Sequence, residues 1–322
     1  MLVAYGISEK GPEPLAGGEG IPEGTTWLDL FRPTQEEDRT AEGFLGASLP
    51  TREEVQEIEF SSRLYNEDGA VFMTASLLTG VDVGKPILAP LTLVVAGERL
   101  VTLRYDEFRA VKHFLARAGK PGSGCINVPA AFLGLLEAVI DRAADVLERI
   151  SGDVDRLNAE IFTQRQNGKR GRSLQVLIGE IGIQGDLAAK ARESLASLER
   201  LVQFAGLALP PTFDKGPNKG RLKLAGRDIR SIEDQVEFLS TKITFLLEAT
   251  LGLTSVEQNE VIRVLTVAAT FFFPPTLVGT IYGMNFEFMP ELHWVFGYPL
   301  AIAAMIVSAL VPYFYFKRKG WL

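Results

Sequence analysis

The fold is decided by the stretch Tyr282-Gly283-Met284-Asn285-Phe286-Glu287-Phe288-Met289-Pro290-Glu291-Leu292-His293-Trp294-Val295, a short polar turn between two long uncharged segments. Neither flanking segment, residues 264–281 nor residues 294–316, contains Asp, Glu, Lys or Arg. A helix rises about 1.5 Å per residue and needs about 20 apolar residues to cross a bilayer, so each segment is long enough to span one. We therefore predict a transmembrane helical hairpin with residues 283–293 as its exposed loop and residues 294–316 as its second span.

The charges around the hairpin indicate its orientation. The loop carries Glu287 and Glu291 but no Lys or Arg, whereas a basic run, residues 317–319, follows the second span. Positively charged residues next to membrane helices favour the cytoplasmic side. We therefore expect the tail, residues 317–322, to be cytoplasmic. Because two spans return the chain to its starting side, the large N-terminal part is expected there too.

Composition limits the classes of function. The formal net charge is −7 at pH 7 and no dense stripe of Lys and Arg occurs, which argues against nucleic acid as a partner. The single cysteine, Cys125, excludes an intrachain disulfide framework and a cysteine-rich metal site. Residues 1–220 show no pairing of a nucleophile with a base, and the chain has only two histidines. We therefore expect neither an enzyme nor a resident cofactor.

Residues 1–125 have the pattern of a mixed α/β unit. Short runs rich in β-branched and aromatic residues, separated by turn residues, predict strands. Strands are expected at Leu2–Ile7, Thr26–Phe31, Val71–Leu78, Leu88–Val95 and Leu100–Tyr105. Helices are expected at Thr34–Gly46, Thr51–Phe60 and Asp106–Ala118, two of which open with Thr followed by acidic residues.

Residues 126–209 are predicted to form a long antiparallel helical hairpin. Asn127 is a suitable helix cap, and Pro129 is suited to the first helical turn. Apolar residues then recur every three or four positions as far as Ile161, and residues 174–205 repeat the pattern after a polar break. Together with the mixed sheet, this pattern predicts an α+β cytoplasmic domain of the αβα type.

A further long helix, the stalk, is predicted to lead into the membrane. Residues 210–220 have the composition of a linker. Residues 221–282 keep a three- and four-residue apolar spacing with no obvious stop before Pro274, which predicts one helix of about 60 residues that enters the membrane at about residue 261. We interpret the apolar seam of this helix as an assembly surface. The seam consists of Ile229, Ile232, Val236, Leu239, Ile243, Leu246 and Leu253.

Two membrane helices cannot enclose a path through lipid, so conduction would require several copies around an axis, most simply a cyclic homo-oligomer. One face of the first span is mostly apolar with polar positions at intervals, which suits a constriction that gates by losing its water. The alternative is ordinary helix packing, with threonines bonded back to the backbone. The face consists of Asn259, Ile262, Leu265, Ala269, Phe273 and Thr276.

The tip of the hairpin offers neutral oxygen atoms. Gly283 is expected to adopt a positive φ that ends the helix and exposes backbone carbonyls, and Asn285 adds an amide oxygen. Such oxygens suit Mg²⁺, which releases water reluctantly and can be held through its hydration shell. Glu287 and Glu291 would raise the local concentration of cations. The alternative is that the Gly-Met-Asn triplet is only a helix C-cap and turn.

Several motifs resemble those of a known family. They are Phe273-Pro274-Pro275-Thr276-Leu277, Tyr282-Gly283-Met284-Asn285, Met289-Pro290-Glu291-Leu292 and the terminal Tyr315-Phe316-Lys317-Arg318-Lys319-Gly320-Trp321-Leu322. On these motifs, residues 257–322 resemble the CorA magnesium and cobalt channel family, and residues 51–59 resemble it more weakly. The Gly-Met-Asn triplet is highly specific when it lies at the tip of a membrane hairpin.

The resemblance implies a homopentameric funnel in the inner (cytoplasmic) membrane, with both termini cytoplasmic and the stalk helix lining the pore. It also implies passive Mg²⁺ uptake driven by the membrane potential, with Co²⁺ and Ni²⁺ as secondary ions and closure by intracellular Mg²⁺. Identical copies, membrane lipid and divalent cations would be the partners. A ZntB-type zinc transporter of the same architecture is an alternative, but such proteins usually depart from Met at position 284. A membrane-anchored scaffold is another alternative.

The resemblance also assigns site residues by position. Gly283, Met284 and Asn285 match the ion selectivity filter, and the six residues of the first-span face match pore-lining positions. The basic residues Lys317, Arg318 and Lys319 match a collar around the cytoplasmic mouth. The family's regulatory acidic sites transfer less well. Candidates on the stalk, for which no partner is identified, are Asp228, Glu233, Asp234 and Glu237.

Overall fold

A computed structural model describes residues 1–8, 11–15, 20–57, 63–120, 124–166, 172–285 and 289–319, with residues 163–166, 291 and 292 described by their backbone alone. The chain divides into two compact units, Met1–Leu247 and Glu248–Leu322. The long helix α6, Arg221–Tyr282, belongs to both units.

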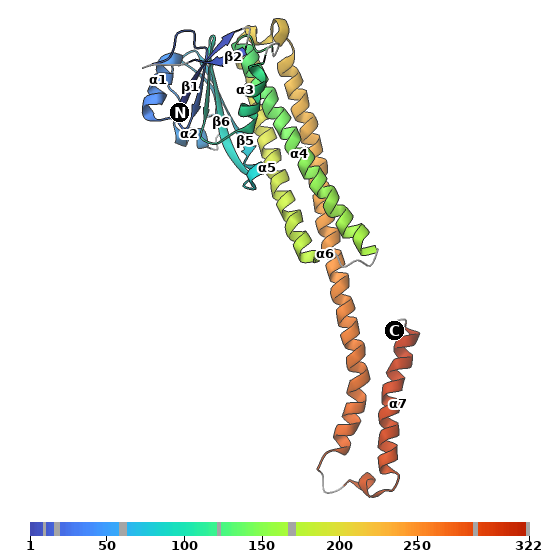
Figure 1. The fold of residues 1–322 in the computed structure, drawn as a ribbon. Helices are drawn as coiled ribbons and strands as arrows, with labels where there is room; N and C mark the ends of the chain where they lie inside the picture. Colours follow the sequence, from blue (N-terminus) through green and yellow to red (C-terminus); the bar gives the residue numbers. More distant parts are fainter. Residues whose placement is uncertain are drawn as a thin grey trace. The chain divides into compact units, whose positions relative to one another are not determined.

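The first unit is built on a seven-stranded sheet with the order β2-β1-β3-β7-β6-β5-β4 (Figure 1). Within the described part of the chain, β3 and β7 are the one parallel pair, and the other neighbours are antiparallel. Five strands lie where the sequence predicts them. The edge strands β2 and β4 were not expected, because four residues are too few for an alternating pattern to be recognised. The bounds are β1 Leu2–Ser8, β2 Gly11–Pro14, β3 Trp27–Phe31, β4 Leu64–Glu67, β5 Ala70–Thr79, β6 Ile87–Ala96 and β7 Arg99–Arg104.

A buried ion pair joins the two parallel strands. Arg104 of β7 donates from Nε and Nη2 to the two carboxylate oxygens of Asp29 on β3, at 3.1 and 2.8 Å. Thr102 donates its hydroxyl to the same carboxylate at 2.6 Å, and Trp27 Nε1 donates to the Thr102 hydroxyl at 3.3 Å. Both charged side chains are almost completely buried. This network holds the register in which Asp29 lies opposite Thr102.

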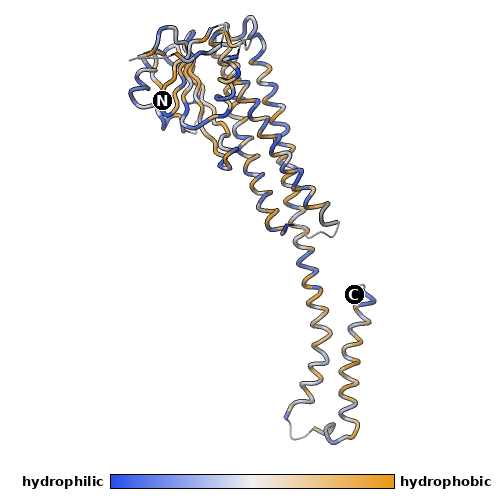
Figure 2. Tube along the Cα trace, in the orientation of Figure 1, coloured by the Kyte–Doolittle hydropathy of each residue, from blue (hydrophilic) through white to orange (hydrophobic). Residues whose placement is uncertain are grey.

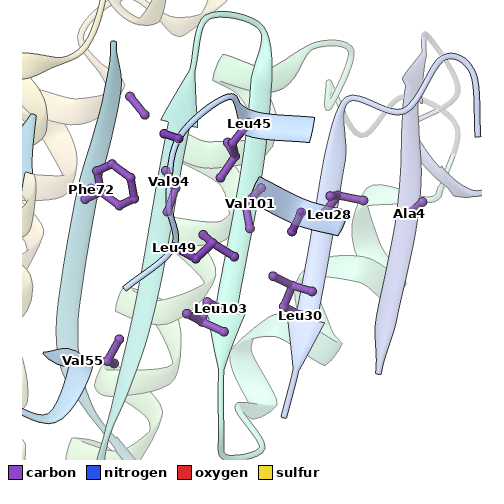
Figure 3. Close-up of a cluster of buried hydrophobic side chains, with 13 residues drawn as sticks. Ala4, Leu28, Leu30, Leu45, Leu49, Val55, Phe72, Val94, Val101 and Leu103 are labelled. Atoms are coloured by element: carbon purple, nitrogen blue, oxygen red, sulfur yellow. The ribbon is translucent and has the colours of Figure 1, made fainter. Parts of the chain in front are cut away.

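Helices α1 (Gln35–Leu45) and α2 (Arg52–Gln56) lie on one face of the sheet. Figure 3 shows Leu45 and Val55 packed with sheet residues such as Val101 in one cluster of buried side chains. Each residue in that cluster is at least nine-tenths buried. Burying apolar surface stabilises the folded state by about 25 cal/mol per Å². The short helices thus close one side of the core.

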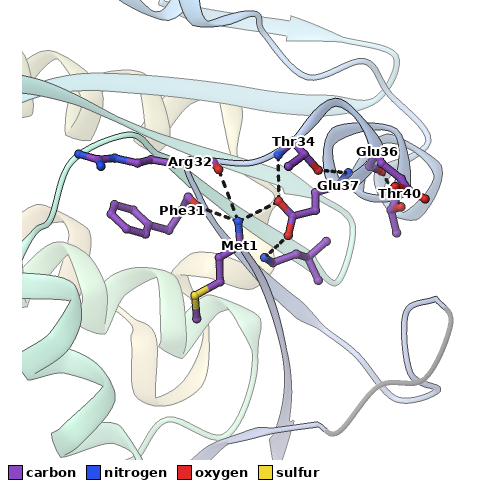
Figure 4. Close-up of polar contacts among 8 residues, drawn as sticks. Met1, Phe31, Arg32, Thr34, Glu36, Glu37 and Thr40 are labelled. Atoms are coloured by element: carbon purple, nitrogen blue, oxygen red, sulfur yellow. Dashed lines mark hydrogen bonds and ion pairs between the residues drawn. The ribbon is translucent and has the colours of Figure 1, made fainter.

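Both short helices begin with a capping box, formed by the Thr and one of the acidic residues that open each of them. Thr34 accepts from the Glu37 backbone N–H, and Glu37 accepts in return from the Thr34 N–H at 2.9 Å and from the Met1 ammonium at 2.8 Å (Figure 4). Thr51 and Glu54 make the same exchange at the start of α2. The prediction that this second helix reaches Phe60 is wrong, because Glu57 has an extended ψ of 143° and ends it.

The other face of the sheet is covered by longer helices (Figure 1). These are α3 (Arg109–Ala118), α4 (Val128–Gln166) and α5 (Leu174–Ala208). The α3 helix starts later than the predicted Asp106, because Phe108 is its extended N-cap residue. Asn127 caps α4 by accepting the Ala130 N–H at 2.9 Å. The predicted antiparallel helical hairpin is present as α4 and α5.

The apolar seam of α6 is buried inside its own chain. After the 3-10 turns η3 (Pro211–Asp214) and η4 (Gly216–Asn218), α6 runs beside α4 and α5 (Figure 1). A methyl group at Gly185 of α5 would lie 3.6 Å from Ile243 of α6. The interpretation of this seam as an assembly surface is therefore wrong for the part of the seam that lies in the first unit of the chain. There, α4 and α5 already cover it. Its buried members are Ile229, Ile232, Val236, Leu239, Ile243 and Leu246.

The second unit contains the end of α6, the 3-10 turn η5 (Pro290–His293) and the helix α7 (Gly297–Arg318). Figure 2 shows hydrophobic residues along α7 and along this part of α6. Both helices are long and apolar enough to cross a membrane. The α6 helix continues through Pro274 and Pro275 to Tyr282, and α7 starts at Gly297, three residues after the apolar segment begins.

Candidate functional site

The end of α6 tightens before the Gly-Met-Asn triplet. The Gly283 N–H donates to the carbonyls of both Gly279 and Thr280, at 3.0 and 3.2 Å, and the Met284 N–H donates to Ile281 at 3.3 Å. Such shared and three-residue bonds are common where a helix ends. Gly283 is not among the described residues with positive φ, so the expectation of a left-handed glycine here is wrong. The helix ends in a tightened turn, and Gly283 does not adopt the positive φ that glycine allows.

The triplet itself is accessible. Gly283, Met284 and Asn285 are all exposed. The tightened turn uses the carbonyls of Gly279, Thr280 and Ile281, and the Asn285 amide follows in the exposed segment directly after it. The Asn285 amide oxygen is a neutral acceptor. Glu287 lies outside the described residues.

Within the second unit, one side of α6 packs against α7. The ring centroids of Phe271 and Tyr313 are 6.2 Å apart, and a methyl group at Gly279 would lie 3.2 Å from Met305 Cε. The α6 residues on this side are partly buried, and they recur every three or four positions. They are Val267, Thr270, Phe271, Pro274, Pro275, Val278, Gly279 and Tyr282.

The predicted pore-lining residues lie away from α7. At about 100° per residue, Ile262, Leu265 and Ala269 fall on the side of α6 opposite the packed one, and so do the two later members. All of the predicted positions are exposed in the single chain, so the described residues of the second unit do not cover this face of α6. They are Asn259, Ile262, Leu265, Ala269, Phe273 and Thr276.

The threonine hydroxyls of α6 bond back to the helix. Thr276 donates to the Phe272 carbonyl at 2.6 Å, and Thr280 donates to the Thr276 carbonyl at 2.7 Å. This is the contact expected if the face served only for packing. It also directs the hydroxyl proton to the backbone, so the oxygen lone pairs that remain can only accept hydrogen bonds. Both interpretations of the face are therefore compatible with its geometry.

The basic run lies at the end of α7. Lys317 and Arg318 occupy its last turn and Lys319 is its cap, where cations interact favourably with the helix dipole. All three are exposed, and Lys317 Nζ lies 5.6 Å from the centroid of the Tyr313 ring. The Lys317 side chain thus points toward the preceding turn of its own helix.

The acidic candidates on the stalk are dispersed. Asp228, Asp234 and Glu237 are exposed on α6, and among the described residues no three His, Cys, Asp or Glu side chains gather to hold a metal ion. Glu233 is half-buried, and burial together with the nearby Glu199 carboxylate raises its pKa. A single chain does not assemble a regulatory site from these residues.

The lone histidine near the tip, His293, is exposed at the end of η5. The backbone of Glu291 belongs to the same turn. Phe238 and Phe245 are exposed on the first-unit part of α6, which was not expected from the sequence. Their seven-residue spacing is the signal that could have revealed them.

These observations define a class of protein. A mixed α/β unit with a long helical hairpin continues through one helix into a pair of membrane-length helices, whose short connection presents neutral oxygens. It is a membrane protein with two candidate spans.

The family follows from comparison with known proteins. Residues 22–318 match the family model described as CorA-like Mg2+ transporter protein, and the chain belongs to that family. The "Magnesium transport protein CorA" of Escherichia coli (strain K12) is 34% identical over 323 residues, covering 100% of both chains. That of Haemophilus influenzae (strain ATCC 51907 / DSM 11121 / KW20 / Rd) is 34% identical over 297 residues, covering 92% of each. The solved CorA magnesium transporter from Methanocaldococcus jannaschii has the same fold, with a TM-score of 0.78, 18% identity, and coverage of 100% of this chain and 99% of that one.

Proposed function

We propose that this protein is a divalent-cation channel of the inner membrane that takes up Mg²⁺. The observation that carries the proposal is the exposed Gly283-Met284-Asn285 triplet at the end of α6, between two membrane-length helices of a CorA-like chain. Backbone and amide oxygens at this point are acceptors for the water shell of a magnesium ion, which loses that shell reluctantly. Because the oxygens are neutral, the ion is held without being trapped.

Several copies are needed to form the path. One chain supplies a single helix face, so the exposed residues of α6 line a channel only when identical copies surround an axis, as in a homopentamer. Such a lumen is ringed by Asn259 and Thr276 and narrowed by Leu265 and Phe273. The apolar rings suit a gate that closes by losing its water. The basic residues at the end of α7 then surround the cytoplasmic mouth.

The driving force is the membrane potential. A divalent ion gains about 4.6 kcal/mol per 100 mV on entering a negatively charged interior. With both termini in the cytoplasm, the triplet faces outward, where the ion arrives. Co²⁺ and Ni²⁺ are secondary ions of the same site. Intracellular Mg²⁺ closes the channel through acidic residues of the stalk, for which Asp228, Asp234 and Glu237 are the candidates.

The test is Mg²⁺ uptake into proteoliposomes loaded with a fluorescent Mg²⁺ indicator, under a potassium diffusion potential. Asn285→Ala should abolish uptake while the oligomer still assembles, because the amide oxygens are lost and the helices are unchanged. His293→Ala, an exposed polar residue of the same connection, is the matched control and should retain uptake. Near-normal flux in Asn285→Ala would remove the filter from the proposal. Zn²⁺ flux above Mg²⁺ flux in the unmodified protein would favour a zinc transporter instead.

A further inference from the structure

Three arginines converge on one carboxylate at the surface of the first unit. Asp82 lies in the 3-10 turn η2 (Val81–Val83), between β5 and β6. Its Oδ2 atom lies 2.8 Å from Nη1 of Arg109, the first residue of α3, and 2.6 Å from Nη2 of Arg142 on α4. Its Oδ1 atom lies 3.7 Å from Nη1 of Arg149, further along α4. The cluster therefore joins three separate elements of the fold.

The arginines bring more hydrogen-bond donors than the nearby acids can accept. A single guanidinium already has more N–H donors than an ionised carboxylate has acceptor positions. Asp145 is the second acid of the cluster, and its Oδ2 atom lies 3.9 Å from Nη1 of Arg142. Counting the acids with which these arginines pair in the described part of the chain, three positive charges meet two negative ones. The cluster is left with unused donors and a single positive charge.

A small apolar cavity lies beside these arginines. Its volume is about 50 Å³, and Asp82, Arg109 and Arg142 form part of its wall. One water molecule needs about 10–15 Å³ of such space, so the cavity has room for about four non-hydrogen atoms. Most of the remaining wall is apolar and comes from β5, η2 and the surrounding helices. Its buried apolar members include Leu77, Val81, Phe108, Val139, Leu195 and Val236.

The turn that carries Asp82 has a fixed shape. Gly80 and Gly84, on either side of η2, have φ values of 75° and 70°, in the left-handed region that favours glycine. A methyl group at Gly80 would lie 2.1 Å from the Lys85 carbonyl oxygen, and the Lys85 N–H donates to the Gly80 carbonyl at 3.0 Å. This turn holds the Asp82 carboxylate in place, so the three arginines are gathered before any ligand arrives, which lowers the cost of binding.

The start of α3 adds to the positive field at the cavity. Its N-cap residue, Phe108, makes no side-chain capping bond, and its first turn contains no acidic residue. The N–H groups of a first turn have no partner within the helix and carry partial positive charge. Phe108, Arg109 and Ala110 all belong to the cavity wall. The helix end therefore strengthens the attraction that the arginines exert on an anion.

We propose that this cavity binds a small monocarboxylate with a short apolar tail of about four carbon atoms. The carboxylate of the ligand takes donors of Arg109, Arg142 and Arg149 that Asp82 leaves unused, because guanidinium groups pair with carboxylates through two parallel hydrogen bonds. The tail fills the apolar cavity. A single negative charge balances the cluster, whereas a doubly charged phosphate would exceed it. Binding here ties the turn between β5 and β6 to α3 and α4, and it does not require the ion path proposed above.

The test is equilibrium dialysis of the full-length protein in detergent against radiolabelled ligands. 3-Methylbutanoate, whose tail matches the cavity, should bind at least about tenfold more tightly than acetate, because burial of two further carbons contributes about that factor. 3-Methylbutanamide has the same shape without the charge, and it should bind at least about tenfold more weakly than the carboxylate. Arg142→Gln should weaken binding of 3-methylbutanoate by a similar factor. Arg230→Gln, which removes an exposed pair with Glu199, is the matched control and should not.

A second variant separates the tail from the head of the ligand. Ala143 belongs to the cavity wall and is half-buried, so Ala143→Leu should fill the cavity and remove the advantage of 3-methylbutanoate over acetate. Acetate binding should stay unchanged, which a misfolded protein would not show. Ala144→Leu, at the next position of α4, is the control and should keep the advantage.

Three results would overturn the proposal. The first is an absence of saturable 3-methylbutanoate binding by the unmodified protein. The second is equal binding by Arg142→Gln and the unmodified protein. The third is a preference for 3-methylbutanoate over acetate that survives Ala143→Leu. Selective binding that depends on both positions supports the proposal.

Discussion

The Ser194 hydroxyl oxygen lies 3.0 Å from the backbone nitrogen of Leu78 and accepts its hydrogen bond. One turn later on α5, Ser197 accepts from the Ser76 N–H at 2.9 Å. The short strand β4 pairs with β5 as far as Met73, and within the described residues no strand follows it beside the rest of β5. Two serines of α5 thus accept the backbone hydrogen bonds that a neighbouring strand would otherwise accept at this edge of the sheet.

The first prediction concerns this edge of the sheet. Ser194→Ala or Ser197→Ala leaves a partly buried backbone N–H without an acceptor, which should cost about 1–3 kcal/mol of the free energy of unfolding. In a unit of this size that lowers Tm by about 2–4 °C per kcal/mol. Ser231→Ala, on the exposed side of α6, is the control. Differential scanning fluorimetry of the full-length protein in detergent measures the shift, and equal Tm values for all three variants would contradict the assignment.

The second prediction concerns the ion pair between Asp29 and Arg104. Asp29→Leu alone leaves the Arg104 guanidinium buried and unpaired, which should cost about 3–5 kcal/mol. Replacing both, with Asp29→Leu and Arg104→Met, removes the stranded charge and should recover most of that loss. The double-mutant cycle is measured from unfolding midpoints of the full-length protein. A double variant that is no more stable than Asp29→Leu would show that the charge pair is not the source of the cost.

The membrane hairpin could be predicted from sequence because its signal is local. Two uncharged segments and a polar turn give length and connection without any knowledge of the soluble unit. The capping boxes at Thr34 and Thr51 are equally local, and both are present. The edge strands β2 and β4 could not be predicted, since their place is determined by the neighbour to which each bonds.

The apolar seam on α6 shows why the packing partners of a helix could not be predicted. A repeat of three and four residues shows that one side of a helix is covered, but it does not show which segment covers it. Ile229 and Val236 are buried against helices of their own chain, whereas Phe238 is exposed. At the candidate site, the six predicted pore-lining residues are exposed, and their role stays a prediction. The expected conformation of Gly283 is wrong, because the helix ends by a tightened turn.

The third prediction concerns pH. Arg172 donates from Nε to Glu160 at 2.8 Å and also pairs with Glu180, which ties the start of α5 to α4. The hydrogen bonds from Arg172 lower the pKa of Glu160 below its ordinary value of 4.5. Because the folded-state pKa is the lower one, this pair stabilises the fold above about pH 4.5, and the contribution is lost as the pH falls through the folded pKa.

Arg172→Gln should therefore lower Tm at pH 7 and make little difference near pH 3. The expected loss of stability at pH 7 is small, because the pair is exposed and solvent screens it. Lys190→Gln, which removes an exposed pair with Asp186, is the control and should change Tm less. Thermal unfolding at a series of pH values measures both. A constant difference between Arg172→Gln and the parent across the series would contradict the role of Glu160.

The last prediction concerns the prolines inside the membrane helices. Pro274 and Pro275 of α6 lack the N–H groups that would donate to the carbonyls of Thr270 and Phe271. In α7, Pro312 likewise lacks the N–H that would donate to the carbonyl of Ser308. In lipid an unpaired carbonyl is costly, and an interior proline costs about 3 kcal/mol or more of helix stability.

Pro275→Ala and Pro312→Ala should therefore each raise the Tm of the full-length protein in detergent, because each restores an intrahelical bond. Pro299 provides the matched control. It lies in the first turn of α7, where the missing N–H would have no partner within the helix, so Pro299→Ala should leave Tm unchanged or lower it slightly. If Pro299→Ala stabilised the protein as much as the interior variants, the gain would come from the helix propensity of alanine. The restored hydrogen bond would then not be its cause, which would contradict the prediction.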